Sequence, residues 1–507
     1  MRKKTVFFTP MLSGFMRISC ATALMLILGA CGSSDGDGGS SLGSGSGNGS
    51  GGNGAGSGGS SGGTDTGGGG GSDNGGGGSS VPAIKFLSAT DGINGRELWK
   101  TDGTSEGTVL VKDINTSNPT GSNPNGLTEL NGTFYFQAND GVNGTELWKT
   151  DGTADGTVLV KDIYPLQYDS NPHNFTPLNG VMYFVADDNV HGQEVWKTDG
   201  TTDGTVLVKD IKTADLVGSY PSYLTVFNDA VYFTAGEGST RNGFRNFEIW
   251  KTDGTAEGTV LVKDMNPERK NISGPDGFTV YNDALYFQGD YNLWKTDGTP
   301  AGTVFVADVY PYQLTEFNGL LYFPGRGADG VELWKTDGTG TGTMQVADIN
   351  PGGGSSHPQG LTKFNGMLYF GAENVTLNRE LWRTDGTTAG TALVKEINPS
   401  ASEESNPAGF TVFNDALYFT ASDRKLNYEL WKTDGTGEST VMVDPTKQSN
   451  SFPLILWALD DALYFTADDE ANGKELLKTD GTGIQLVKDI CPGPCDGEVT
   501  SFKKNPA

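Results

Sequence analysis

An aspartate followed six positions later by a glutamate recurs along this sequence, with glycine or asparagine between the two in several copies. The pairs are Asp91 and Glu97, Asp140 and Glu146, Asp188 and Glu194, Asp423 and Glu429, and Asp469 and Glu475. Oxygen-rich loops of this kind could hold Ca²⁺, but they lack the spacing of an EF-hand loop. Ordinary turn chemistry, with the glutamate paired to a lysine of a neighbouring strand, is therefore the favoured interpretation. We expect no cofactor, and Ca²⁺ is the alternative.

A second candidate motif is Thr-Asp-Gly-Thr, first seen at residues 101–104 and repeated through the chain. In such a turn the Asp carboxylate accepts backbone N–H groups, glycine adopts a positive φ, and the threonine hydroxyls tie the ends together. Catalysis needs one site, whereas this motif occurs nine times. We interpret it as a structural turn.

Other catalytic signatures do not appear in the sequence. His173, His191 and His357 are the only histidines and form no metal-binding pattern such as H-E-x-x-H. There is no G-x-S-x-G nucleophile elbow and no P-loop. We therefore predict that the chain is not an enzyme, and that it acts as a binding or adhesion module for a protein or glycan ligand.

One segment departs from the repeat in a way that suits recognition. The fourth unit carries an insertion with two arginines and two phenylalanines, Arg241, Phe244, Arg245 and Phe247, where other units are short and acidic. Loops on a rigid scaffold often carry binding residues. Tolerance of insertions at a surface loop is the competing explanation.

The elements that would position these residues belong to a repeat of 40 to 54 residues. Its copies align on Trp99, Trp148, Trp196, Trp250, Trp294, Trp334, Trp382 and Trp431, with Leu477 in the ninth. The second copy shows four strand-like runs, at residues 126–130, 133–137, 146–150 and 157–161. They are rich in β-branched and aromatic residues and are separated by turn residues. Asn131-Gly132 predicts a tight antiparallel hairpin, so each unit should be a four-stranded meander.

Such units predict an all-β protein, a β-propeller of four-stranded antiparallel blades, nine in number. The first unit starts at residues 84–88, which match a second strand, and the C-terminal residues 497–502 match a first strand. A C-terminal strand would therefore close the ring and leave no open sheet edge. An open β-solenoid and two smaller propellers are the alternatives.

The repeated phrase, Glu97-Leu98-Trp99-Lys100-Thr101-Asp102-Gly103-Thr104 in its first copy, resembles that of the bacterial ELWxxDGT repeat proteins. The match covers residues 84–502. The resemblance implies a surface or secreted protein and assigns no activity. The Thr-Asp-Gly-Thr turns are also similar to the Asp-box of sialidase-type propellers, which keeps a glycan-directed hydrolase as an alternative, although no arginine motif supports it. A structural spacer of the envelope is the third hypothesis.

The N-terminal thirty residues predict a signal peptide, because basic residues precede an apolar run from Ile18 to Ala30 that is too short to span a bilayer comfortably. The run ends in Leu28-Gly29-Ala30-Cys31, which resembles the lipobox of bacterial lipoproteins. This resemblance implies that Cys31 is lipidated and becomes the mature N-terminus. Residues 31–80 then form a flexible tether rich in glycine and serine, and residues 81–507 form the repeat domain. We expect a lipid-anchored protein of the outer membrane or cell surface of a bacterium.

The formal net charge of -27 excludes some partners. A chain this acidic repels phosphate backbones, so nucleic acid is not expected to bind. Cys491 and Cys495 are separated by Pro-Gly-Pro and, outside the cytoplasm, predict a small structural disulfide.

Overall fold

Strand pairing in this chain begins with local hairpins. Asn131 and Gly132 have φ values of 52° and 79°, the left-handed conformation at both positions that a type I′ turn requires. The turn joins β4 (Asn125–Leu130) to β5 (Thr133–Asn139), and Leu130 pairs with Thr133 across it. Asparagine and glycine tolerate this conformation with little strain, so the hairpin predicted from the sequence forms at these residues.

The computed structural model describes residues 84–213, 217–237, 246–265, 274–376, 378–399, 404–423, 428–444, 451–459, 462–468, 471–493 and 495–502. These residues contain no helix, and their strands form nine antiparallel sheets, or blades.

Blade 1 comprises β1 (Lys85–Thr90), β2 (Arg96–Thr101), β3 (Val109–Lys112) and β37 (Thr500–Ser501), and blade 2 comprises β4, β5, β6 (Thr145–Thr150) and β7 (Val158–Lys161). Blade 3 comprises β8 (His173–Leu178), β9 (Val181–Asp187), β10 (Gln193–Thr198) and β11 (Val206–Leu207). Blade 4 comprises β12 (Ser222–Phe227), β13 (Ala230–Glu237), β14 (Asn246–Thr252) and β15 (Val260–Lys263).

Blade 5 comprises β16 (Asp276–Tyr281), β17 (Ala284–Gly289), β18 (Asn292–Thr296) and β19 (Val304–Ala307). Blade 6 comprises β20 (Tyr310–Pro311), β21 (Thr315–Phe317), β22 (Leu320–Gly327), β23 (Gly330–Thr336) and β24 (Met344–Ala347). Blade 7 comprises β25 (Gln359–Phe364), β26 (Met367–Glu373), β27 (Arg379–Thr384) and β28 (Ala392–Lys395).

Blade 8 comprises β29 (Ala408–Phe413), β30 (Ala416–Ser422), β31 (Tyr428–Thr433) and β32 (Val441–Met442). Blade 9 comprises β33 (Leu454–Leu459), β34 (Ala462–Asp468), β35 (Lys474–Thr479) and β36 (Ile484–Lys488).

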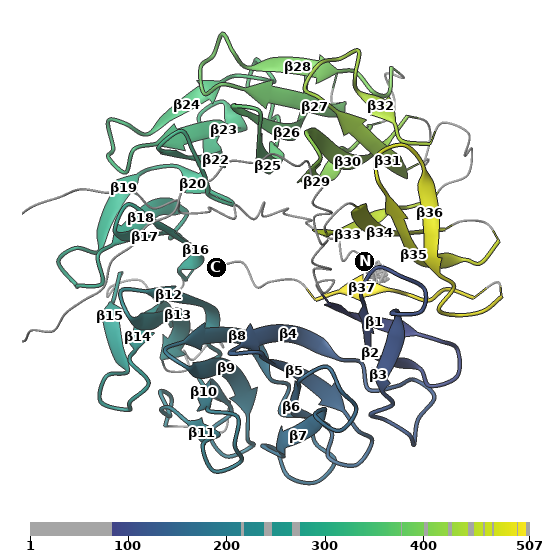
Figure 1. Cartoon of the computed structure of the whole chain (residues 1–507). Helices are drawn as coiled ribbons and strands as arrows, with labels where there is room; N and C mark the ends of the chain where they lie inside the picture. Colours follow the sequence, from purple (N-terminus) through teal and green to yellow (C-terminus); the bar gives the residue numbers. More distant parts are fainter. Residues whose placement is uncertain are drawn as a thin grey trace, which may run out of the picture.

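The nine blades stand in a ring with the first strand of each nearest the central axis (Figure 1). Because the strands alternate in direction, the hairpins between first and second strands and between third and fourth strands lie on one face, which we call the hairpin face. The turns between second and third strands, and the connections from one blade to the next, lie on the opposite face. We call this second face the connector face.

The ring is closed by its C-terminal strand. β37 pairs with β1 through Leu87 with Ser501 and Ser88 with Thr500, so it supplies the first strand that blade 1 lacks. The backbone N–H of Thr90 extends this pairing by donating to the carbonyl oxygen of Gly497 at 2.9 Å. The predicted nine-bladed, closed propeller is therefore confirmed, and the open solenoid and the two smaller rings are excluded.

The hydrophobic core lies between the blades. From blade 2 onward each second strand carries aromatic side chains on both faces, and in β5 Phe136 contacts the core shared with blade 1 whereas Tyr135 contacts the core shared with blade 3. Among the described residues there is one such cluster at each of the nine interfaces between blades, including the interface of blades 9 and 1. Full burial of a phenylalanine contributes roughly 1.5 to 3 kcal/mol, so this inter-blade packing is the main stabilising force of the ring.

Within the residues that the structure describes, no helix has the length and apolar character needed to cross a bilayer.

Candidate functional site

The repeated Thr-Asp-Gly-Thr turn is held by its own side chains. In blade 2 the Asp151 carboxylate accepts hydrogen bonds from the backbone N–H of Thr153 at 2.8 Å and from its hydroxyl at 2.7 Å. Thr150 and Thr157 join the two strands through their hydroxyl groups at 2.7 Å. The bonds from Thr153 hold the pKa of Asp151 below its usual value. The carboxylate is thus occupied in building the turn, as the sequence predicted.

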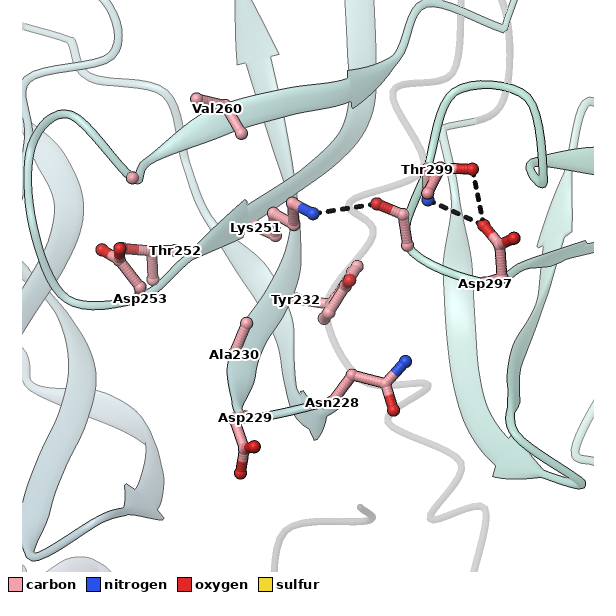
Figure 2. Close-up of a pocket in the computed structure, with 12 residues that line it drawn as sticks. Asn228, Asp229, Ala230, Tyr232, Lys251, Thr252, Asp253, Val260, Asp297 and Thr299 are labelled. Carbon is pink, nitrogen blue, oxygen red and sulfur yellow. Dashed lines mark hydrogen bonds between the residues drawn. The ribbon is translucent and has the colours of Figure 1, made fainter.

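The lysine of the repeated phrase connects neighbouring blades. Lys149 Nζ donates to the carbonyl oxygen of Gly200, in the Thr-Asp-Gly-Thr turn of blade 3, at 2.9 Å. Figure 2 shows the equivalent bond from Lys251, which reaches the carbonyl oxygen of Gly298 at 2.9 Å. The expectation that the repeated glutamate pairs with a lysine is therefore wrong, because the lysine binds a backbone carbonyl of the next blade.

The repeated glutamate instead anchors the connection between blades. Glu146 is fully buried, and its carboxylate accepts hydrogen bonds from the backbone N–H of Ile163 at 2.7 Å and from the N–H and hydroxyl of Ser170 at 3.0 and 2.6 Å. Burial raises the pKa of Glu146 to about 7, against the lowering effect of these bonds. Related bonds to the connection that follows the fourth strand are made by Glu97, Glu194, Glu429 and Glu475.

The aspartates of the Asp/Glu loops, for which Ca²⁺ binding was the alternative interpretation, cap turns on the connector face. Asp140 accepts the backbone N–H groups of Val142 and Asn143 at 2.9 and 2.8 Å, and Asp91 and Asp188 do the same in blades 1 and 3. Asp423 follows β30, and Asp469 lies outside the described residues. Among the described residues there is no group of three acidic, histidine or cysteine side chains that could hold a metal ion. These aspartates and glutamates therefore do not gather into a calcium site in the described part of the chain.

Few of the other predicted site residues fall in the described part of the chain. Cys31, Arg241, Phe244 and Arg245 lie outside it. Phe247 is half-buried in β14. It lies close to Gly274, just before blade 5, and a Cβ added at Gly274 would overlap the Cβ of Phe247.

The two C-terminal cysteines are joined. Cys491 and Cys495 form a disulfide in the connection from β36 to β37. The Cys491 sulfur lies 2.9 Å from where a Cβ of Gly92 would stand, in the turn between β1 and β2. The disulfide therefore lies at the seam where the ring closes.

A groove of about 450 Å³ lies on the hairpin face between blades 4 and 5 (Figure 2). Its walls come from the turn at Asn228 and Asp229 and from the Thr-Asp-Gly-Thr turns of both blades. Lys251 is the positively charged side chain in the lining of the groove. Its Nζ already donates a hydrogen bond to the carbonyl oxygen of Gly298. Since the same turns recur around the ring, the groove is a consequence of the repeat.

The described histidines and arginines are spread over several blades, and two of them, His357 and Arg379, share the Glu373 carboxylate in blade 7. His191 pairs with Asp188 in blade 3, and His357 lies 3.4 Å from Glu373 in blade 7. The arginines are distributed over blades 1, 6 and 7: Arg96 pairs with Glu498, Arg379 pairs with Glu373, Arg383 bonds to the carbonyl oxygen of Gly435, and Arg326 is exposed at the end of β22. The arginine cluster that a sialidase-like site requires is therefore not formed by the described residues.

Four tyrosines on the connector face of blades 4 to 6 break the symmetry of the ring. We call Tyr223, Tyr291, Tyr310 and Tyr312 the tyrosine patch. The rings of Tyr291 and Tyr310 are 5.5 Å apart, and those of Tyr310 and Tyr312 are 4.8 Å apart. Tyr291 is 63% exposed, whereas the repeated tyrosines of the second strands are buried. The patch is thus an accessible aromatic surface made by three blades.

Tyr223 adopts an unfavourable backbone conformation. It occupies the bulge near the start of β12 with a φ of 57°. At this bulge, blades 2, 5, 7 and 8 place glycine and blade 3 places asparagine: Gly126, Gly277, Gly360, Gly409 and Asn174. A bulky residue in this region costs of order 1 to 3 kcal/mol, and such strain is concentrated at functional sites.

Asp276 lies near the rings of Tyr223 and Tyr310. It is the first residue of β16 and pairs with Gln288 of β17. Burial raises the pKa of Asp276 to about 6. The pKa of Tyr310 is raised by burial first, then by the charge of Asp276 and by the neighbouring phenols of Tyr312, Tyr291 and Tyr223. The phenols of Tyr223 and Tyr310 therefore lie near one partly buried carboxylate, and the rings of Tyr291 and Tyr312 lie against Tyr310.

Sequence reasoning missed the tyrosine patch, although a signal was present. Eight of the 17 tyrosines stand at one position of the second strand, as Tyr135 does. Of the remaining nine, eight fall between residues 164 and 312, and seven of these lie on the connector face: Tyr164, Tyr168, Tyr220, Tyr223, Tyr291, Tyr310 and Tyr312. A comparison of the repeats for tyrosine outside its regular position would have selected this region.

No family model matches this sequence, and no curated protein does either. Similar solved structures include a puromycin hydrolase, which is 12% identical with a TM-score of 0.37 over 70% of this chain and 59% of that chain. Apo AztD from Citrobacter koseri is 13% identical with a TM-score of 0.38 over 83% of this chain and 95% of that chain. Oligopeptidase B from Leishmania major is 10% identical with a TM-score of 0.36 over 68% and 53%. At these TM-scores the likeness carries no argument about substrate or mechanism.

The prediction that the chain is not an enzyme is corrected by these comparisons, because a hydrolase and peptidases are among the similar structures. The chain spans 59% of the length of the puromycin hydrolase. The comparisons assign this chain no peptidase activity.

Proposed function

We propose that this protein is a lipid-anchored β-propeller of the bacterial cell envelope that binds a partner through the tyrosine patch. The observation that carries the proposal is the strained Tyr223, which stands where other blades use glycine or asparagine. Glycine would avoid the strain of the positive φ at this position, whereas the half-exposed Tyr223 ring gains an edge-on contact with Phe278 at 6.3 Å. Its presence beside three further accessible tyrosines is explained by recognition.

The chemistry of the tyrosine side chain supports a binding role. Tyrosine offers a large apolar ring with a hydrogen-bonding hydroxyl, and only two side-chain torsions must be ordered when it binds. Tyr223, Tyr291 and Tyr312 are 48, 63 and 45% exposed, so their rings can contact a partner without rearrangement of the core. The inter-blade cores hold the backbone beneath them, as expected of a preorganised surface.

Site-specific photo-crosslinking in the producing cells tests the proposal. A photoreactive phenylalanine analogue in place of Tyr291 or Tyr312 should give a discrete crosslinked species. The same analogue in place of Asp229, which is exposed on the hairpin face of blade 4, should not. Equal crosslinking from both faces, or none from Tyr291 and Tyr312, would contradict the proposal.

The variant Tyr223→Gly separates binding from folding. It removes the ring and relieves the positive φ, so the melting temperature should stay the same or rise while the yield of the Tyr291 crosslink falls. Tyr168→Ala is the matched control, because Tyr168 is 56% exposed on the connector face of blade 2, outside the patch. This control should leave the yield unchanged.

Membrane attachment is tested at Cys31, which lies outside the described residues. Cys31→Ser should abolish lipid labelling and release the protein from washed membranes, because each buried CH₂ of the lipid contributes about 0.8 kcal/mol. Retention of the variant in the membrane fraction would contradict the lipobox.

A further inference from the structure

The carboxylate of Asp276 has no positive partner among the described residues. No ion pair between described residues includes it, and burial accounts for its raised pKa. With its amide nitrogen facing the carboxylate, Gln288 donates to the two Asp276 oxygens at 3.2 and 3.0 Å, and its amide oxygen accepts the backbone N–H of Tyr291 at 2.9 Å. Gln288 thus holds the carboxylate in place beside Tyr291 but does not neutralise its charge.

The surroundings of Asp276 favour a cation. The face of an aromatic ring carries negative charge density and attracts an ammonium or guanidinium group within about 6 Å. A partly buried carboxylate that lacks a counter-charge gains further from such a group, because water no longer stabilises it. Tyr223 and Tyr310 lie near enough for the charge of Asp276 to raise their pKa values. The rings and the carboxylate therefore act on the same region of space.

The same features exclude other ligands. An anion would face the charge of Asp276 on a chain whose net charge is -27. An inorganic cation such as Ca²⁺ takes six to eight oxygen ligands, and the described residues contain no group of three or more acidic, histidine or cysteine side chains that could hold such an ion. A free amine in a binding pocket is usually buried over most of its surface, whereas these rings remain 45 to 63% exposed at Tyr223, Tyr291 and Tyr312. An open aromatic surface suits a side chain presented by a macromolecule.

We propose that the tyrosine patch binds a lysine or arginine side chain of a protein partner, with Asp276 as the counter-charge. This inference rests on the proposed function, and it names the chemical class of the group that is bound. Arginine fits this arrangement well, because its planar guanidinium can stack on a ring while its N–H groups bond to a carboxylate.

The inference is tested on the mature lipidated chain in detergent with three capped pentapeptides. Their central residue is arginine, lysine or citrulline, with glycine elsewhere, and citrulline has the shape of arginine without its charge. Saturation-transfer NMR detects the weak binding that one side chain provides. The arginine and lysine peptides should bind at least about tenfold more tightly than the citrulline peptide, as expected when a hydrogen bond to a charged group is lost.

Matched variants identify the site. Asp276→Asn should weaken the arginine peptide about tenfold and leave the citrulline peptide unaffected. Asparagine stands at the equivalent place in blade 2, at Asn125, so the variant should fold, and its melting temperature checks this. Asp229→Asn removes one negative charge from the hairpin face and should leave binding unchanged. Equal loss from Asp229→Asn would overturn the inference, because binding would then reflect net charge alone.

A pH titration gives an independent readout. The groups of the described residues that face Asp276 are Gln288, which does not ionise, and the phenols of Tyr223 and Tyr310, whose pKa values are raised by burial and by the charge of Asp276. Since the pKa of Asp276 is about 6, binding of the arginine peptide should weaken as the pH falls from 7 to 5, and Asp276→Asn should remove this dependence. A pH-independent affinity would contradict the role of Asp276.

The results distinguish this inference from the function on which it rests. If the citrulline and arginine peptides bind equally and Tyr291→Ala weakens both, the cation is wrong while the patch remains a binding surface. If Tyr291 and Tyr312 give no crosslink in cells and Tyr291→Ala leaves peptide binding unchanged, both proposals fail.

Discussion

Lys478 Nζ donates a 3.1 Å hydrogen bond to the carbonyl oxygen of Gly103, and this bond joins the last blade to the first. The same link occurs at the other eight interfaces, with arginine in place of lysine at one of them: Lys100 to Gly152, Lys149 to Gly200, Lys197 to Gly254, Lys251 to Gly298, Lys295 to Gly338, Lys335 to Gly386, Arg383 to Gly435 and Lys432 to Gly481. The closing interface is thus built like the others.

Removal of the closing strand should destabilise the whole ring. Deletion of residues 498–507 removes β37, the buried Val499 and the ion pair of Glu498 with Arg96. It also leaves the edge of β1 unpaired, which favours aggregation. We expect the melting temperature to fall by more than about 5 °C, measured by differential scanning calorimetry. Deletion of residues 504–507 is the control, and unchanged melting after the longer deletion would contradict a closed ring.

The glycine of the repeated turn should tolerate no side chain. Gly298 has a φ of 93°, and a Cβ there would overlap the hydroxyl of Tyr232 in the preceding blade. Gly319 also has a positive φ, 74°, but open space surrounds its Cβ position. Gly319→Ala should therefore cost about 1 to 2 kcal/mol for its backbone conformation alone. Gly298→Ala should cost roughly 1 to 3 kcal/mol more because of overpacking. Equal costs in denaturant unfolding would show that Tyr232 moves aside freely.

The fold could be predicted because its signals are local. Asn131-Gly132 specifies a hairpin by its own backbone preferences, and the four strands of each blade follow one another along the chain. The first unit lacks a first strand and the C-terminal residues match one, so the sequence also predicted the closure of the ring by the strand that contains Ser501. Repetition of these short-range signals accounts for the success.

The roles of the repeated charged residues could not be predicted, because their partners are distant in sequence. Glu146 bonds to Ser170, 24 residues away, and Lys149 bonds to Gly200, 51 residues away. Periodicity shows that such residues matter to every blade but not which atoms they contact. The tyrosine patch is harder still, since Tyr223, Tyr291 and Tyr312 come from three blades.

Calcium should have little effect on stability. Asp140 and Glu146 already accept hydrogen bonds from backbone N–H groups of their own loops, so Ca²⁺ would have to displace these bonds to bind. We expect the melting temperature of chelator-treated protein to change by less than about 2 °C in millimolar Ca²⁺. A rise of more than roughly 10 °C would establish occupied calcium sites and overturn the structural interpretation of these loops.

Stability should fall as the pH rises from 5 to 8, because of the buried glutamates. Burial raises the pKa values of Glu146, Glu194, Glu248, Glu380 and Glu475 to about 7, from an ordinary value of 4.5. The unfolded chain releases these protons near pH 4.5, whereas the folded protein retains them up to about pH 7. In this window the unfolded state binds fewer protons, so the free energy of unfolding decreases as pH rises.

Below this window the opposite trend should appear. Asp102, Asp151 and the other turn aspartates have lowered pKa values because threonine groups bond to their carboxylates, and this stabilisation is lost as they are protonated under acid conditions. The melting temperature should therefore be highest near pH 5 and lower at pH 8 by roughly 5 °C or more. Glu146→Gln should lower it at every pH, because an amide offers only one acceptor oxygen to the donors of Ile163 and Ser170, and should flatten its decline above pH 5. A melting temperature that is constant or rises between pH 5 and 8 would show that these glutamates are ionised in the folded ring.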